Sequence, residues 1–204
     1  VYRVGQGEAW SEWFQFRTAS AEDRPFRFVY FGDAQNRIRD LWSRVVRAAA
    51  LDAPDAAFLL RAGDLVNVAE RDSEWGEWFG AGSWLNATLP QLATPGNHEY
   101  TKGVLSSHWR PQFAFPGNGP EGLEETVYWL DYHGVRFVSL NTMEGLEEQL
   151  DWLPDVLGDG DPSWTIVFQH HPLFSAAKGR DNEELRTHLK PLYDEFGVDL
   201  VLQG

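Results

Sequence analysis

The stretch AFLLRAGD, residues 57–64, passes from an apolar run into a Gly-Asp pair and decides how the rest of the chain is interpreted. The apolar run predicts a buried strand, and the Gly-Asp pair lies where that strand should end. Three other stretches repeat this form: RFVYFGDAQ (27–35), LPQLATPGNHE (89–99) and TIVFQHHP (165–172). Open α/β sheets gather ligands at the carboxyl ends of their strands, so we expect the polar residues of all four stretches to converge.

The converging side chains are of types that bind metal ions. We take Asp33, Asp64, Asn97 and His170 as candidate metal ligands, because carboxylate, amide and imidazole groups suit divalent or trivalent cations. Each has an ordinary alternative: a Gly-Asp pair can cap a helix, and a histidine near a proline can belong to the core or the surface. The presence of all four stretches in one chain favours a metallohydrolase.

The composition limits the partners of the chain. Its 204 residues include 17 basic and 31 acidic side chains, which give a net charge of −14, and there is no cysteine. A surface this acidic repels phosphate backbones, so we expect no nucleic-acid partner. Without cysteine, disulfides, thiolate metal sites and cysteine nucleophiles are excluded. No apolar run approaches about 18 residues, so no transmembrane segment is expected.

Strand and helix patterns alternate along most of the chain, which predicts an α/β (α+β) fold with a mixed sheet and helices outside. Asp181, with Glu184 three residues later, is expected to cap the last helix. The predicted elements, besides the four buried strands, are helices at 38–49, 73–80, 146–156 and 181–196, and hairpin strands at 126–132 and 136–141.

The first residues have a different pattern. The alternation in WFQFRT, residues 13–18, predicts an antiparallel strand, and the small and charged residues 19–25 predict a linker. The strand belongs either to a preceding β domain or to the edge of the main domain.

The order of the motifs resembles that of the calcineurin-like metallophosphoesterases, and most closely their purple acid phosphatase branch. The resembling motifs are Gly-Asp at Asp33, Gly-Asp at Asp64, Gly-Asn-His-Glu at 96–99 and His-x-Pro at 170–172. The stretches WRPQF (109–113), FPGNG (115–119) and YWLDY (128–132) are similar too, and VDLVLQG (198–204) resembles the strand that precedes a Gly-His-x-His motif in that family. The likeness extends from about Phe26 to Gly204.

The resemblance implies a metallophosphoesterase β-sandwich flanked by helices. Residues 23–204 would form the catalytic domain, incomplete at its C-terminal end because the Gly-His-x-His motif would follow Gly204. Residues 1–22 would be the remnant of a fibronectin-like β-sandwich and its linker.

The resemblance also implies the roles of the site residues. Asp64 would bridge two metal ions, Asp33 would bind the first, and Asn97 and His170 would bind the second. His98 would stabilise or protonate the leaving-group oxygen, and Glu99 would accept a ring N–H from His98. The implied reaction is hydrolysis of phosphomonoesters or phosphodiesters by in-line attack of a metal-bridging hydroxide, as in an acid phosphatase.

Two departures from the family pattern concern the first metal. Purple acid phosphatases carry a tyrosine three residues after the bridging aspartate, where this chain has Asn67, and other family members carry Asp-x-His where this chain has Gln35. Gln35 and Asn67 are therefore candidates for weak ligands or for hydrogen bonds to metal-bound water. Loss of the anionic ligand favours divalent Mn, Fe or Zn over ferric iron.

The remaining predictions are less specific. His171 is expected beside the ligands, and Lys178 and Arg180 are either contacts for the substrate phosphate or solvated loop charges. The expected substrate is a small phosphate ester, and the expected location is secreted or periplasmic. Two other functions stay open: a non-catalytic interaction module with a degraded first metal site, and a carbohydrate-binding domain suggested by the 10 tryptophans.

Overall fold

Two β-sheets that pack against each other form the body of the protein. The structure is a computed structural model that describes residues 1–204. The first sheet is parallel, in the order β3-β4-β5, and the second is mixed, in the order β11-β10-β9-β8, with β8 and β9 forming an antiparallel hairpin. The strands are β3 (Val29–Phe31), β4 (Leu59–Ala62), β5 (Gln91–Thr94), β8 (Tyr128–Tyr132), β9 (Val135–Ser139), β10 (Trp164–Gln169) and β11 (Leu200–Gln203).

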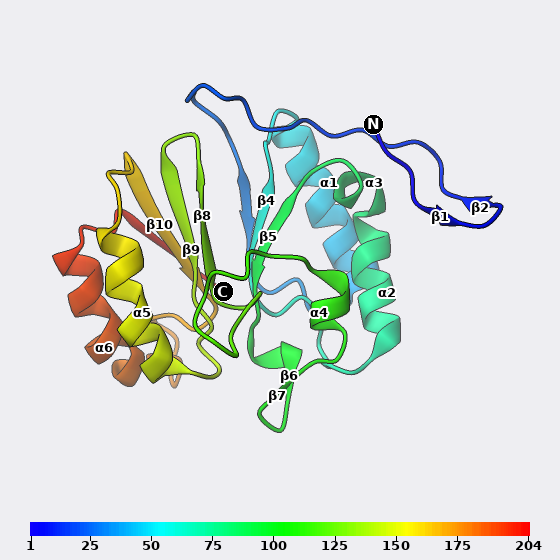
Figure 1. The fold of residues 1–204 in the computed structure, drawn as a ribbon. Coiled ribbons are helices and arrows are strands. Elements are labelled where there is room, and N and C mark those ends of the chain that lie inside the picture. The colour runs from blue at the N-terminus through cyan, green and yellow to red at the C-terminus, as the bar shows by residue number, and fades with distance from the viewer.

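Helices cover the outer faces of the two sheets, as Figure 1 shows. On the first sheet these are a π-helical turn (Ile38–Trp42), α1 (Ser43–Asp52), α2 (Asp72–Ala81) and α3 (Ser83–Asn86), and on the second α5 (Leu146–Gly158) and α6 (Glu183–Glu195). The short elements β6 (Tyr100–Thr101), β7 (Val104–Leu105) and α4 (Trp109–Gln112) follow β5 through a 3₁₀ turn (Asn97–Glu99). The expected α/β class and metallophosphoesterase-type sandwich are confirmed.

Large apolar side chains on the facing surfaces of the two sheets explain why two layers form. Phe58, Leu60 and Leu92 from the first sheet pack against Phe137 and other apolar residues of the second sheet in one buried cluster. The Phe58 and Phe137 rings meet edge to face, with centroids 5.3 Å apart. Burial of such large apolar surfaces supplies most of the drive to bring the layers together.

The sequence predicted the last helix correctly but not its start. Helix α6 begins at Glu183, and the residue before it is Asn182. The Asp181 carboxylate instead accepts hydrogen bonds from the Arg186 side chain (2.7 Å) and from the Ser175 backbone N–H (3.3 Å). The predicted cap at Asp181 is therefore wrong, because a charged partner one turn into the helix attracts this carboxylate away from the helix end.

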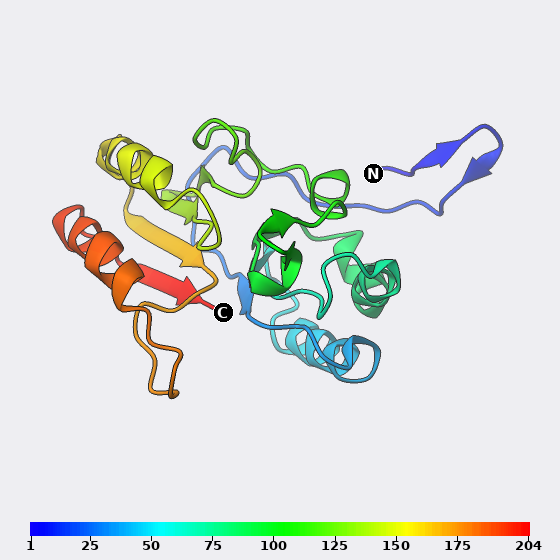
Figure 2. The same cartoon turned by 90° about the horizontal axis from the view of Figure 1, so that it is seen from below.

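The N-terminal residues do not form the strand predicted at 13–18. Their backbone pairs only through an isolated bridge between Tyr2 and Phe14, and a short hairpin of β1 (Gly5–Gln6) and β2 (Ala9–Trp10) projects from the body (Figure 2). A strand needs a neighbour to pair with, and residues 15–18 have none here. The assignment of 1–22 to a fibronectin-like domain stays a prediction.

None of the helices combines the length and the apolar character that a membrane crossing would require.

One hydroxyl group links the two sheets directly. The fully buried Tyr128 hydroxyl on β8 donates to the Ala93 carbonyl (2.9 Å) and accepts from the Ala93 N–H (3.0 Å) at the outer edge of β5. We expect Tyr128→Phe to lower the free energy of unfolding by about 1–3 kcal/mol, because it leaves both Ala93 groups buried and unpaired. Urea denaturation measures this change. Tyr132→Phe at the other end of β8 is the control, and equal losses in both variants would contradict the bridging role.

Candidate metal centre

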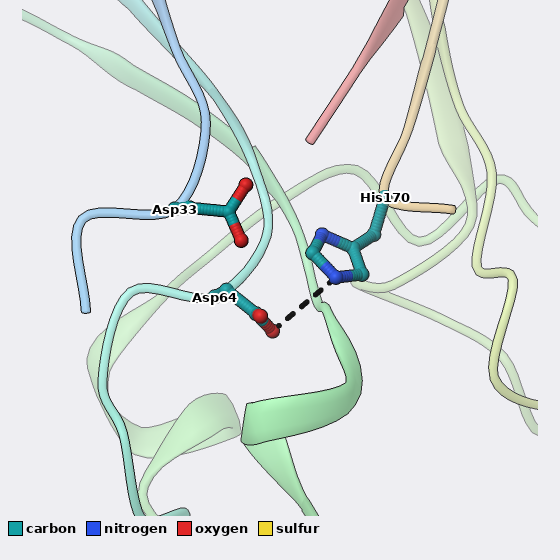
Figure 3. A group of neighbouring side chains, drawn as sticks. All are labelled: Asp33, Asp64 and His170. Carbon is teal, nitrogen blue, oxygen red and sulfur yellow. Dashed lines mark ion pairs between the residues drawn. The ribbon is translucent and has the colours of Figure 1, made fainter. Parts of the chain in front are cut away.

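The structure brings the four candidate ligands together at the carboxyl ends of β3, β4, β5 and β10. Ligand atoms of Asp33, Asp64 and His170 all lie within 4.8 Å of one another, and Figure 3 shows these three side chains pointing toward a common point. The Asn97 Oδ1 atom lies 3.1 Å from His170 Nε2. Residues separated by up to 137 positions, the difference between 33 and 170, therefore meet in one place.

Both aspartates are held in a strained backbone conformation. Asp33 has a φ of 39° and Asp64 a φ of 55°, a left-handed region that non-glycine residues seldom occupy. Such strain persists only where the surroundings impose it, and it is concentrated at functional sites. Glycine is required close by, because a Cβ at Gly96 would collide with the Asp64 carboxylate.

His170 is oriented so that one ring nitrogen is free for a cation. Its Nδ1 lies 2.8 Å from the Ala62 carbonyl, which can only accept, so Nδ1 carries a proton. Its Nε2 faces Asn97 Oδ1 at 3.1 Å and Asp64 Oδ1 at 3.4 Å. These oxygens and a neutral Nε2 repel one another unless a proton or a metal ion lies among them. Burial lowers the pKa of His170, but its hydrogen bond to Asp64 and the Asp64 charge outweigh burial and raise it.

Asp64 occupies the centre of the cluster. Its Oδ1 accepts the His98 backbone N–H at 2.9 Å, and its Oδ2 accepts the Gln35 side-chain amide at 2.8 Å. Burial raises the pKa of Asp64, but the hydrogen bond and charge of His170 outweigh it and lower the pKa. Burial also raises the pKa of Asp33, which the His170 charge opposes and the Asp64 charge increases.

Gln35 supplies an independent sign that a cation fits here. Its amide nitrogen donates to Asp64, whereas its Oε1 atom is buried and has no hydrogen-bond partner. An unpaired buried acceptor is costly, and a metal ion near Asp33 and Asp64 would satisfy it. The donor set of carboxylate and amide oxygens with one imidazole nitrogen fits divalent metal ions.

Glu99 does not accept a ring N–H from His98, so that prediction is wrong. The Glu99 side chain is fully buried, and its carboxylate accepts backbone N–H groups from two loops. The donors are Gly96 (2.7 Å), Asp64 (2.8 Å), Leu65 (2.8 Å) and Val66 (3.3 Å). Burial and the Asp64 charge raise the pKa of Glu99 to about 7, against the lowering effect of these N–H groups.

The partner of the His98 ring is a backbone group. His98 Nδ1 lies 2.7 Å from the carbonyl oxygen of Asn67, and Nε2 lies 4.0 Å from Asp64 Oδ2. Every residue has a carbonyl, so the sequence carries no signal that could have identified this partner. The Asn67 side chain itself makes no hydrogen bond, and the residue contributes through its backbone.

Of the other predicted residues, His171 lies beside the cluster, with its ring centroid 5.0 Å from that of His170, whereas Lys178 and Arg180 lie in an exposed loop. His171 Nδ1 is 2.9 Å from the Thr142 hydroxyl, and burial together with the His170 charge lowers the pKa of His171. Lys178 and Arg180 are exposed in the loop before α6, and neither side chain forms a hydrogen bond or an ion pair. The structure does not bring these two cations into contact with Asp33, Asp64 or His170.

Two packed sheets whose parallel strand ends carry two aspartates, an amide and a buried imidazole agree with the class of metal-dependent phosphoesterases. The chain belongs to the calcineurin-like phosphoesterase family, whose family model matches residues 26–204.

Relatives agree with this assignment. The zebrafish acid phosphatase type 7 is 26% identical, and the match covers 99% of this chain and 52% of that protein. An uncharacterized protein of Mycobacterium tuberculosis is 28% identical over 92% of this chain and 43% of its own length. The chain thus spans about half the length of these relatives.

Solved structures share the fold. A purple acid phosphatase from yellow lupin seeds has a TM-score of 0.77 at 21% identity, covering 96% of this chain and 40% of that one. The protein GAP50, described as the anchor in the inner membrane complex of Plasmodium, has a TM-score of 0.63 at 15% identity, covering 88% and 65%.

We expect Asp64→Asn to lose more bound metal than Asp33→Asn. Asp64 is buried at the centre of the cluster, whereas Asp33 is exposed at its side. A central carboxylate offsets the repulsion between two cations, which scales inversely with their separation. Equilibrium dialysis against Mn²⁺ or Zn²⁺ with elemental analysis measures the loss. Equal metal content in the two variants would contradict a central role for Asp64.

The pH dependence of metal binding follows from the raised pKa of His170. In the metal-free protein, a protonated His170 stabilises the fold below the ordinary histidine pKa, and this contribution is lost as the pH rises through the raised value. A metal ion takes the place of that proton, so its binding strengthens over the same range. We expect Mn²⁺ to raise the Tm more at about pH 8 than at about pH 5.

The control for this experiment is His170→Gln, which removes the titrating ring but keeps a polar side chain. Its response to Mn²⁺ should be weaker and should lose most of the dependence on pH. A Tm increment in the parent protein that is the same at both pH values would mean that no such competition occurs.

Proposed function

We propose that this chain is the metal-binding part of a hydrolase that cleaves small phosphomonoesters or phosphodiesters by in-line attack of water on phosphorus. The observation that carries the proposal is the convergence of Asp33, Asp64, Asn97 and His170 with the His98 ring beside them. Membership of the calcineurin-like phosphoesterase family supports it.

We divide the proposed cation contacts between two sites that share Asp64. Asp33 and the Gln35 side-chain oxygen would hold one divalent cation, Asn97 and His170 the other, and Asp64 both. When bound, such cations lower the pKa of water and offset charge on the phosphoryl oxygens. Mn, Fe and Zn in their divalent states fit this donor set better than ferric iron does, because the chain offers no phenolate at position 67.

His98 is suited to interact with the leaving group. The Asn67 carbonyl accepts from Nδ1, so the proton that can move is the one on Nε2. That nitrogen faces Asp64 Oδ2 at 4.0 Å, and the ring is about one-third exposed, with 34% of its side-chain surface accessible. When the ring carries a proton on both nitrogens, a substrate oxygen leaving the cluster can therefore receive a proton or a hydrogen bond from Nε2.

The proposal also includes the class of substrate, which follows from the net charge of the chain, and the location of the protein. The net charge of −14 favours small phosphate esters over nucleic-acid polymers, whose many phosphates such a surface would repel. A secreted or periplasmic location stays a prediction.

A second candidate is a non-catalytic interaction module that keeps the fold. The shared fold of GAP50, which is described as an anchor, favours it, and so do Gln35 and Asn67 in place of stronger ligands. The strain maintained at Asp33 and Asp64 counts against it, because an inert scaffold gains nothing from these conformations. Metal analysis combined with turnover of nitrophenyl phosphate separates the candidates. Metal without turnover under any condition would favour the module.

His98→Ala should keep the metal but lose rate, most strongly for alkyl phosphates. A leaving oxygen of high pKa needs a proton in the transition state, whereas a nitrophenolate needs little help, and general-acid contributions are about 10²- to 10⁴-fold. Hydrolysis of an alkyl and a nitrophenyl phosphate is compared in parent and variant, with metal content measured in parallel. An equal loss on both esters, together with loss of metal, would identify His98 as a ligand or a structural residue.

A further inference from the structure

Five consecutive backbone N–H groups in the loop after β4, residues 64–68, are all accepted by two carboxylates. Glu99 accepts the first three, as described above. Glu74 accepts the other two, from Asn67 and Val68, through its Oε2 atom at 2.8 Å each. Asp64 lies at the end of the loop held by Glu99, and Asn67 lies at the end held by Glu74.

Glu74 is itself firmly placed. It lies in the first turn of α2, where an acidic side chain interacts favourably with the helix dipole, and only 14% of its side-chain surface is exposed. Its second oxygen, Oε1, accepts a hydrogen bond from the Arg71 guanidinium. Both carboxylate oxygens are therefore paired, so Glu74 has a fixed position from which it can hold the backbone of the loop.

The link from Glu74 to His98 passes through one peptide group. The Val68 N–H and the Asn67 carbonyl belong to the same planar trans peptide, so they point in opposite directions. Glu74 accepts the N–H on one side at 2.8 Å, and the carbonyl on the other side accepts from His98 Nδ1 at 2.7 Å. Rotation of this peptide would break both contacts together.

We propose that Glu74 is a positioning residue for His98: by fixing the Asn67–Val68 peptide, it keeps the proton of the neutral His98 ring on Nδ1 and leaves Nε2 toward the metal cluster. The effect on the ring rests on the geometry alone. The effect on catalysis rests on the proposed hydrolysis, in which Nε2 serves the leaving group.

The test compares Glu74→Ala and Glu74→Gln with a matched control, Glu77→Ala. Glu77 lies on the same helix and is exposed, so its replacement removes the same charge without touching the loop. The first readout is the ¹⁵N NMR signals of the His98 ring in the metal-free protein, at a pH where the ring is neutral, assigned with His98→Ala. The second is the ratio of alkyl to nitrophenyl phosphate turnover at equal metal content.

We expect Glu77→Ala to match the parent protein in both readouts. Glu74→Ala should shift His98 toward a mixture of tautomers and lower alkyl-ester turnover by about 10- to 100-fold, the usual range for a residue that orients a functional group. Glu74→Gln keeps an acceptor oxygen and should give intermediate values. If Glu74→Ala fails to fold, the ring signals and turnover of Glu74→Gln test whether Glu74 positions His98.

Unchanged ring signals in folded Glu74 variants would overturn the proposal, because a residue that only stabilises the loop would not alter the tautomer. If neither parent nor variants hydrolyse any ester, the proposed function fails, but the ring signals still show whether Glu74 positions His98.

Discussion

The buried carboxylate of Glu99 is the constraint on which the rest of the site depends. It accepts backbone N–H groups from the loop after β4 and from Gly96 in the loop after β5, so it ties together the segments that carry Asp64 and Asn97. The N–H donors around this fully buried carboxylate stabilise its ionised form and so oppose the rise in its pKa that burial and the Asp64 charge cause. By accepting the Asp64 N–H, Glu99 helps to hold the left-handed backbone of Asp64 in place.

The same loop then serves two kinds of chemistry. Asp64, the first residue of this loop, places its carboxylate among ligand atoms that repel one another unless a cation or a proton lies between them. Asn67, the fourth residue of the loop, presents its backbone carbonyl to the His98 ring. Glu99 and Glu74 hold the two ends of the loop separately, so ligand geometry and ring orientation can respond to different substitutions.

The departures from the family pattern concentrate on one half of the cluster. The half with Asn97 and His170 has a donor set close to that of the resembled family, whereas the half with Asp33 offers a neutral amide at Gln35. A neutral oxygen binds a cation more weakly than an anionic ligand does. If two cations bind as proposed, their affinities would be unequal, which is compatible with both the hydrolase and the anchor-like alternative.

The sequence by itself determined the layers of the fold and the ligand candidates. Apolar runs followed by polar residues specify buried strands with functional ends, because strand periodicity and burial are local properties. The tertiary structure decided the roles of Glu99, Glu74 and the Asn67 carbonyl, and it left residues 15–18 outside any strand. These depend on which loops meet in space and on backbone groups that every residue carries, so no local pattern in the sequence could specify them.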